Sequence, residues 1–109
     1  MKIENIPFTN IDWTTLPATE SRGESGTATS KEMTLGNIRL RRIRFSPNYT
    51  ADHWCTKGHI VTVLEGSLTA TLQTGETHIT TAGNTFVVSD NLAPHRAQTT
   101  TGAKVLIID

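Results

Sequence analysis

The segment from Asp52 to Gly66 carries side chains that can bind a metal ion. It holds the single cysteine of the chain, Cys55, and two of the four histidines, His53 and His59. In an extended strand, residues two apart point to the same face, so His53, Cys55 and His59 would share one face. Imidazole and thiolate are the side chains that hold late first-row metals. We therefore expect a metal site made of His53, Cys55 and His59, with His95 added from a turn-rich stretch.

A structural interpretation of the same residues remains open. A free cysteine is among the most commonly buried residue types and often acts as a small apolar side chain. The two histidines of the segment could be ordinary strand residues. The spacing His-x-Cys-x-x-x-His favours ligation, although short patterns of this kind also occur by chance.

Composition limits the classes of function. The 109 residues predict one domain, and ten basic residues balance ten acidic ones. We expect no nucleic-acid or membrane partner, because no net positive charge favours either. One cysteine cannot form an internal disulfide, and a free thiol fits a reducing compartment. With no signal-peptide pattern and no apolar run of about 20 residues, the predicted location is the cytoplasm.

The pattern of short β-branched runs and frequent turns predicts an all-β sandwich or small barrel. We expect strands to begin at Thr27, to turn at Glu65-Gly66, and to include 50–55 and 59–64. A β-bulge near Arg41-Arg42 would reconcile the two parities of the strand 38–46. The last strand, 103–109, is nearly all apolar, which predicts burial on both faces.

Residues 1–26 form an irregular N-terminal arm in this interpretation, and 27–109 form the barrel. A helical turn over 12–16 with Asp12 as its N-cap is expected in the arm, and loop from Ala18 onward. The arm carries apolar residues without a core of their own, which predicts a homodimer that buries part of it. Those residues are Ile3, Ile6, Phe8, Ile11 and Trp13.

The stretch from Ser46 to Asp109 resembles the cupin superfamily, whose fold is a double-stranded β-helix, or jelly-roll barrel. In the first cupin motif, His53 and Cys55 stand at the two histidine positions and His59 at the glutamate position. Gly66 takes the closing glycine, and Gly83 and His95 match the second motif. The residues Asp52-His53-Trp54-Cys55 look more narrowly like the small single-domain bacterial cupins with a DHCW motif.

The resemblance implies a divalent transition metal on His53, Cys55, His59 and His95. Because a thiolate replaces a histidine, zinc is expected before nickel, iron or copper. Three imidazoles and one thiolate could close a tetrahedral structural zinc site, whereas a higher coordination number would leave room for a substrate.

Other side chains are weaker candidates. Asp52 or Glu65 could orient an imidazole through its second nitrogen. His78 should face solvent, with Ile79 facing inward. The arginines Arg39, Arg41, Arg42 and Arg44 predict a solvated strand face, and Arg42 or Arg44 could reach the barrel mouth and hold an acidic ligand.

Three functions stay open at this point, because a fold does not determine a function. The first is a metal-dependent enzyme acting on a small polar molecule inside the barrel. The second is a non-catalytic cupin, a sensor or accessory protein that binds a small ligand or a metal at a structural site. The third is a structural jelly roll in which Cys55 and the histidines bind nothing.

Overall fold

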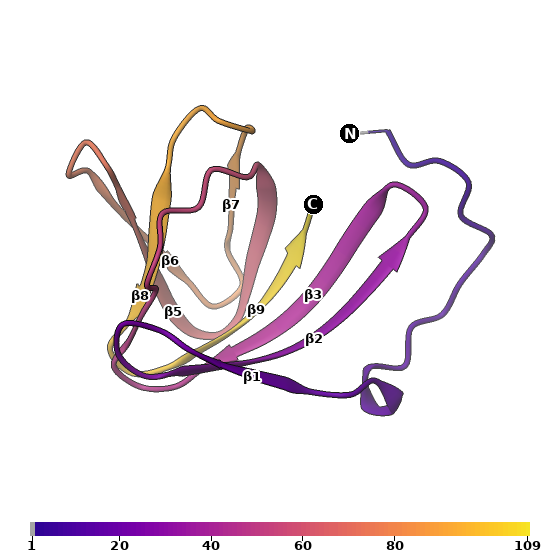
Figure 1. Cartoon of the computed structure of the whole chain (residues 1–109), viewed down its shortest axis with the longest axis horizontal. Coiled ribbons are helices and arrows are strands. Elements are labelled where there is room, and N and C mark those ends of the chain that lie inside the picture. Colours follow the sequence, from indigo (N-terminus) through magenta and orange to yellow (C-terminus); the bar gives the residue numbers. More distant parts are fainter. Residues whose placement is uncertain (1) are drawn as a thin grey trace.

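The structure, a computed structural model, describes residues 2–109 as a curled antiparallel sheet that forms half of a barrel (Figure 1). Within these residues, one short 3-10 helix, η1 (Trp13–Thr15), precedes the strands. The strands are β1 (Thr19–Arg22), β2 (Thr27–Leu35), β3 (Ile38–Phe45), β4 (Tyr49–Thr50), β5 (His59–Leu72), β6 (Thr77–Thr81), β7 (Thr85–Val88), β8 (His95–Thr99) and β9 (Ala103–Ile108).

The long strand β5 joins the two halves of the fold. Its first part pairs with β7 and β9, and its second part pairs with β6 and β8. The register shifts between Val63 and Glu65, so β5 bends there instead of turning back. Gly66 follows with a positive φ of 76°, and a Cβ atom would lie 2.2 Å from the carbonyl oxygen of Gly102. The expected turn at Glu65-Gly66 is therefore wrong, and this glycine instead lets β5 pass close to the loop before β9.

The core lies on the concave side of this sheet and sets the direction of the candidate ligands. Val61 and Val63 of β5 and Val105 of β9 are its least exposed large side chains. Alternate residues of a strand face the same side, so His59 points inward with Val61 and Val63. The apolar row of β5 thus ends in a buried imidazole at the edge of the core.

The predicted all-β architecture is confirmed, and several local predictions are wrong. The expected β-bulge at Arg41-Arg42 is absent, because β3 pairs in a continuous register with both β2 and β9 and keeps one parity along its length. Ile79 is 70% exposed, because β6 lies at the edge of the sheet with Thr80 facing inward. In β9, one face is buried and the other is only half-buried.

The N-terminal arm is more ordered than its composition predicts. Asp12 caps η1 as expected, accepting a hydrogen bond from the backbone of Thr14. The stretch expected as loop contains β1, which pairs with β2. In Figure 1 the arm curves past the turn that joins β2 to β3, and the backbone of Glu4 donates to the side chain of Asn37 in that turn.

No helix within the described residues 2–109 is long and apolar enough to cross a membrane.

Candidate metal centre

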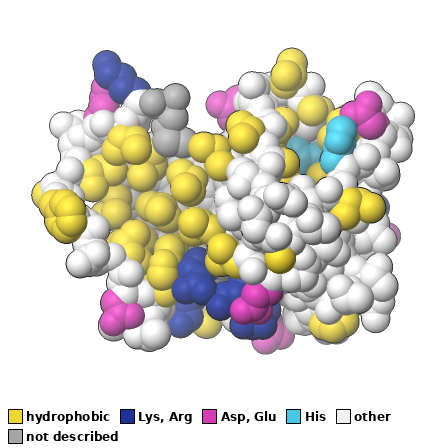
Figure 2. Space-filling view, turned by 180° about the vertical axis from the view of Figure 1, so that it is seen from behind, with side chains coloured by type: hydrophobic (Ala, Val, Ile, Leu, Met, Phe, Trp, Pro, Cys, Tyr) yellow, Lys and Arg dark blue, Asp and Glu magenta, His cyan; other side chains and the backbone are white. Residues whose placement is uncertain are grey.

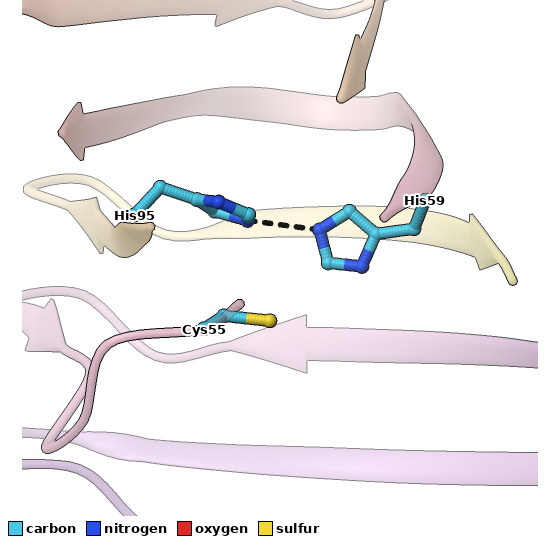
Figure 3. Close-up of side chains that lie close together, drawn as sticks. All are labelled: Cys55, His59 and His95. Carbon is cyan, nitrogen blue, oxygen red and sulfur yellow. Dashed lines mark hydrogen bonds between the residues drawn. The ribbon is translucent and has the colours of Figure 1, made fainter. Parts of the chain in front are cut away.

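Three side chains from separate elements converge at one edge of the core. Cys55 lies in the loop between β4 and β5, His59 begins β5 and His95 begins β8. One ligand atom from each lies within 4.8 Å of the others. Figure 3 shows the two imidazoles directed at one another, with the sulfur of Cys55 on the same side of the sheet. Two nitrogens and one sulfur in this arrangement are the donors of a late transition-metal site.

Backbone hydrogen bonds and the loop before β8 fix the position of His95. The backbones of His95 and Cys55 donate to each other, with N···O distances of 2.7 and 3.0 Å. The Nδ1 atom of His95 lies 2.9 Å from the carbonyl oxygen of Ala93. A carbonyl only accepts hydrogen bonds, so Nδ1 carries the hydrogen. In the neutral ring, Nε2 is then left with its lone pair directed at the cluster.

The imidazole of His59 is held next to that lone pair. The Nε2 atoms of His59 and His95 are 2.9 Å apart. Because the Nε2 of His95 has no hydrogen, the Nε2 of His59 must donate. Burial, followed by the nearby His95 and Arg41, lowers the pKa of His59 to about 4. The ring is therefore neutral near pH 7, the form that binds a metal.

Cys55 is the less constrained donor. It is half-buried and free, and its sulfur lies 4.0 Å from the carbonyl oxygen of Lys57, a long contact. Of the expected strand 50–55, only Thr50 lies in a strand, the end of β4, and Cys55 pairs with β8 through one isolated bridge. The thiol can therefore move toward the imidazoles at little cost in backbone hydrogen bonds.

His53 does not join the cluster, although it lines the same cavity. Its side chain is exposed, and its Nδ1 donates to the carboxylate of Asp52 at 2.8 Å. The strand parity that placed His53 beside Cys55 fails because this segment is a loop. The ring pairs with Asp52, as expected for an orienting carboxylate. His78 is exposed beside Glu76, outside the cluster, and Glu65 lies near Arg44.

A cavity of about 220 Å³ opens beside the three donors. Among the described residues that line this cavity, Arg41 is the one lysine or arginine. The sequence pattern instead predicted Arg42 or Arg44 at this position. Strand alternation puts Arg41 on the inner face of β3, so Arg42 and Arg44 lie on the other face. The remaining lining is largely apolar and includes Ile43, Phe45, Tyr49, Val61, Leu68, Phe86 and Ile107.

A carboxylate that the sequence interpretation missed lies behind His59. The side chain of Asp109 is 1% exposed and receives hydrogen bonds from Arg39 at 2.9 and 3.1 Å and from Arg41 at 3.1 Å. Burial raises its pKa, but the bond from Arg39 and the charges of both arginines outweigh this, so the pKa of Asp109 is lowered. The sequence signal was that Arg39 and Arg41 are two apart in a strand. Two arginines on the same inward face require a nearby carboxylate to balance their charge. The expected solvated face is wrong for these two residues, which are half-buried.

The donor set fits a metal ion on chemical grounds. Two buried imidazoles present nitrogen donors, and the Nδ1 of His59 is buried with no hydrogen-bond partner. A nitrogen at about 2.1 Å and a sulfur at about 2.3 Å from one ion lie at most roughly 4.4 Å apart, so a small movement of Cys55 would complete the set.

Solved structures with this fold are numerous. The polyketide cyclase RemF of Streptomyces resistomycificus is 20% identical and has a TM-score of 0.76, with 94% of this chain and 78% of that chain covered. A cupin-superfamily sugar phosphate isomerase of Silicibacter pomeroyi is 16% identical, with a TM-score of 0.71 and coverage of 92% and 74%. A cupin 2 conserved barrel domain protein of Leptotrichia buccalis is 25% identical, with a TM-score of 0.64 and coverage of 74% and 39%. No family model matches the sequence, and no curated protein does.

Proposed function

We propose that this chain, whose fold is that of the cupin superfamily, binds a divalent transition metal and takes a small polar molecule into the cavity beside it. The observation that carries the proposal is the pair of buried imidazoles with Nε2 atoms 2.9 Å apart and a thiol within 4.8 Å. Burying polar rings costs free energy unless their groups find partners. A shared metal ion would use the lone pairs of both rings and the thiolate.

Zinc is the metal we propose first, with nickel, iron and copper as alternatives. Thiolate is a soft ligand, and one sulfur with two or three nitrogens is a common zinc set. The coordinating atoms would be Nε2 of His59, Nε2 of His95 and Sγ of Cys55. A metal held there would polarise a bound oxygen group or lower the pKa of a bound water.

The cavity supports a small ligand that carries an acidic group. Arg41 lines it, and only one of its terminal nitrogens donates to Asp109. A guanidinium with free N–H groups matches a carboxylate or phosphate. The apolar lining would hold the rest of the ligand next to the metal donors.

The position of His53 separates the two proposed uses of the site. With His53 outside, three protein donors leave a coordination position for a substrate, which is the arrangement of a catalytic site. This supports an enzyme acting on a small polar molecule; two structural neighbours are enzymes by their names, a polyketide cyclase and a sugar phosphate isomerase. The alternative, a non-catalytic sensor or accessory cupin with a closed structural site, would need His53 to move in as a fourth ligand.

Elemental analysis tests the proposal directly. Protein purified without chelator should contain about one transition-metal ion per chain, because the donors serve one ion. His59→Ala should lose most of that metal, while His78→Ala, which changes an exposed imidazole, should retain it. Metal-free wild-type protein that also fails to take up zinc would contradict the proposal.

We also propose a homodimer that buries part of the N-terminal arm. Phe8 is 99% exposed and Ile3 is 61% exposed. Figure 2 shows apolar side chains gathered over the half of the molecule that contains the arm, β2 and β3. Exposed apolar surface of this kind often marks a contact with another protein.

A further inference from the structure

We infer that Asp109 is a positioning residue for the metal site: its carboxylate accepts a hydrogen bond from Nδ1 of His59 once Nε2 of His59 binds a metal. The inference rests on the proposed metal-binding function and adds a residue that touches neither the metal nor the cavity ligand. It follows from the hydrogen positions in the two imidazoles and from the geometry around Asp109.

Before any metal binds, the single ring hydrogen of neutral His59 lies on Nε2. His95 uses its Nδ1–H on the carbonyl of Ala93, so its Nε2 must accept from Nε2 of His59. The neutral ring of His59 then has a bare lone pair at Nδ1. That atom is buried without a partner and lies 3.7 Å from Oδ2 of Asp109.

The distance of 3.7 Å has a physical reason. A lone pair and a carboxylate oxygen are both acceptors, so they cannot form a hydrogen bond and stay apart. Such an unsatisfied buried nitrogen is costly and needs an explanation. The explanation is that the site is built for the other tautomer of His59.

Metal ligation through Nε2 requires that tautomer. When Nε2 of His59 gives its lone pair to a metal, the hydrogen of the neutral ring must sit on Nδ1. Nδ1–H then faces the carboxylate of Asp109, and closing the gap by less than about 1 Å gives an ordinary hydrogen bond. A carboxylate behind a ligating histidine fixes the ring and raises its basicity.

The carboxylate is held in place for this role. Arg39 grips it with two hydrogen bonds, Arg41 adds a third, and the backbone of Asp109 pairs with that of Arg39 in both directions. These contacts aim Oδ2 at His59 from the side opposite His95. Asp109 is thus placed before any metal binds, and the hydrogen of His59 moves to Nδ1 while a small shift closes the remaining gap.

The test measures zinc affinity by competition with a chromophoric chelator for wild-type protein, Asp109→Asn and Asp109→Ala. Loss of an orienting partner typically costs 10–100-fold in metal affinity. We expect Asp109→Ala to lose about that much and Asp109→Asn, which keeps an oxygen acceptor, to lose less. Glu65→Gln, an exposed carboxylate distant from the site, serves as the matched control and should bind zinc as wild type does.

Nuclear magnetic resonance of the imidazole nitrogens supplies a readout that a purely structural role would not move. In zinc-loaded wild type, His59 should carry zinc on Nε2 and a slowly exchanging hydrogen on Nδ1, shifted downfield by the carboxylate. Asp109→Asn should move that resonance upfield while the protein stays folded.

The outcomes separate the inference from the proposed function. If wild type binds zinc and Asp109→Ala binds it within about twofold, or Asp109→Asn leaves the Nδ1 resonance unchanged, the positioning role is overturned and the metal site stands. Zinc on Nδ1 of His59 would also overturn it. If wild type itself binds no zinc, both fail. Should Asp109→Ala not fold, the Asp109→Asn resonance and affinity decide.

Discussion

The two buried imidazoles and the loop that precedes them are built in different ways. His59 and His95 each begin a strand, β5 and β8, and their backbones belong to the sheet ladder. The stretch from Asp52 to Gly58 lies outside the named strands and is tied to β8 by the bridge at Cys55. The strand residues therefore hold their donor nitrogens through a ladder of backbone hydrogen bonds, while the loop residues have fewer such bonds.

This difference assigns separate roles to the ligands. A rigid pair of donors sets where a metal can sit, because its geometry is fixed by packing before binding. In the proposed site, the thiol and the imidazole from the loop would then set how many coordination positions remain for a ligand. Removing a strand ligand should thus abolish binding, and removing a loop ligand should weaken or change it.

The largest expected effect comes from comparing His95→Ala with His53→Ala. His95→Ala removes a buried donor, and its zinc affinity should fall by more than about 100-fold, beyond the range for an orienting partner. His53→Ala removes an exposed ring and should change affinity by less than about tenfold, below that range. Competition titration measures both. Equal losses of zinc affinity in the two variants would contradict the difference between strand and loop donors and would make His53 a ligand.

Cys55 should show an intermediate effect. Cys55→Ser replaces the soft donor, and zinc affinity should drop by about 10–100-fold, as for a site left incomplete. In wild type, a thiol reagent should label Cys55 slowly with zinc bound and faster after chelation, because ligation protects the thiolate. A labelling rate that chelator does not change would make Cys55 a simple half-buried side chain.

The burial of His59 should also make the stability of the protein depend on pH. His59 has a pKa of about 4 when folded and about 6.5 when unfolded, so between these values the unfolded chain binds more protons. The free energy of unfolding should therefore be highest above about pH 6.5, where His59 is neutral in both states. It should fall by on the order of 2 kcal/mol as the pH drops toward 4, because the unfolded chain takes up the proton first. Urea unfolding of metal-free protein at pH 4.5 and 7 measures it.

His59→Gln should flatten that pH dependence, and His78→Gln should leave it unchanged. His78 is the control because it is an exposed imidazole. The same slope in wild type and His59→Gln would show that His59 is not the buried neutral group responsible.

The N-terminal arm should have the smallest effect on the metal. Deleting residues 2–16 removes the exposed Ile3 and Phe8 and should convert a dimer to a monomer or lower solubility. Phe8→Ser is the milder variant. Neither should change zinc affinity by more than about twofold, since no residue of 2–16 lines the site cavity. Sedimentation at micromolar concentration measures the oligomer, and a monomeric full-length protein would contradict the dimer.

The sequence predicted the strand-borne part of the site better than the loop-borne part. His59 follows the alternation of Val61 and Val63, so its inward direction could be derived from period-two burial. Cys55 and His53 were paired by the same rule, but their segment is a loop in which parity does not apply. The bend of β5 was also missed, because Glu65-Gly66 looks like a turn unless the close approach of Gly102 is known.

Asp109 could not be assigned from the sequence because its partners are distant along the chain. Arg39 lies 70 residues away, and only the β3–β9 register brings the two together. The basic alternation on β3 was visible, but which arginines face inward depends on the position of the core. Charge patterns predict a role for a strand face only after its burial is known.

X-ray absorption spectroscopy of the zinc-loaded protein tests the central claim most directly, because it reports the number and type of donor atoms. We expect one sulfur at about 2.3 Å and two or three imidazole nitrogens at about 2.0–2.1 Å. His59→Ala should lose a nitrogen or fail to bind. A zinc shell made only of oxygen atoms, with no sulfur and no imidazole scattering, would contradict a metal centre at Cys55, His59 and His95.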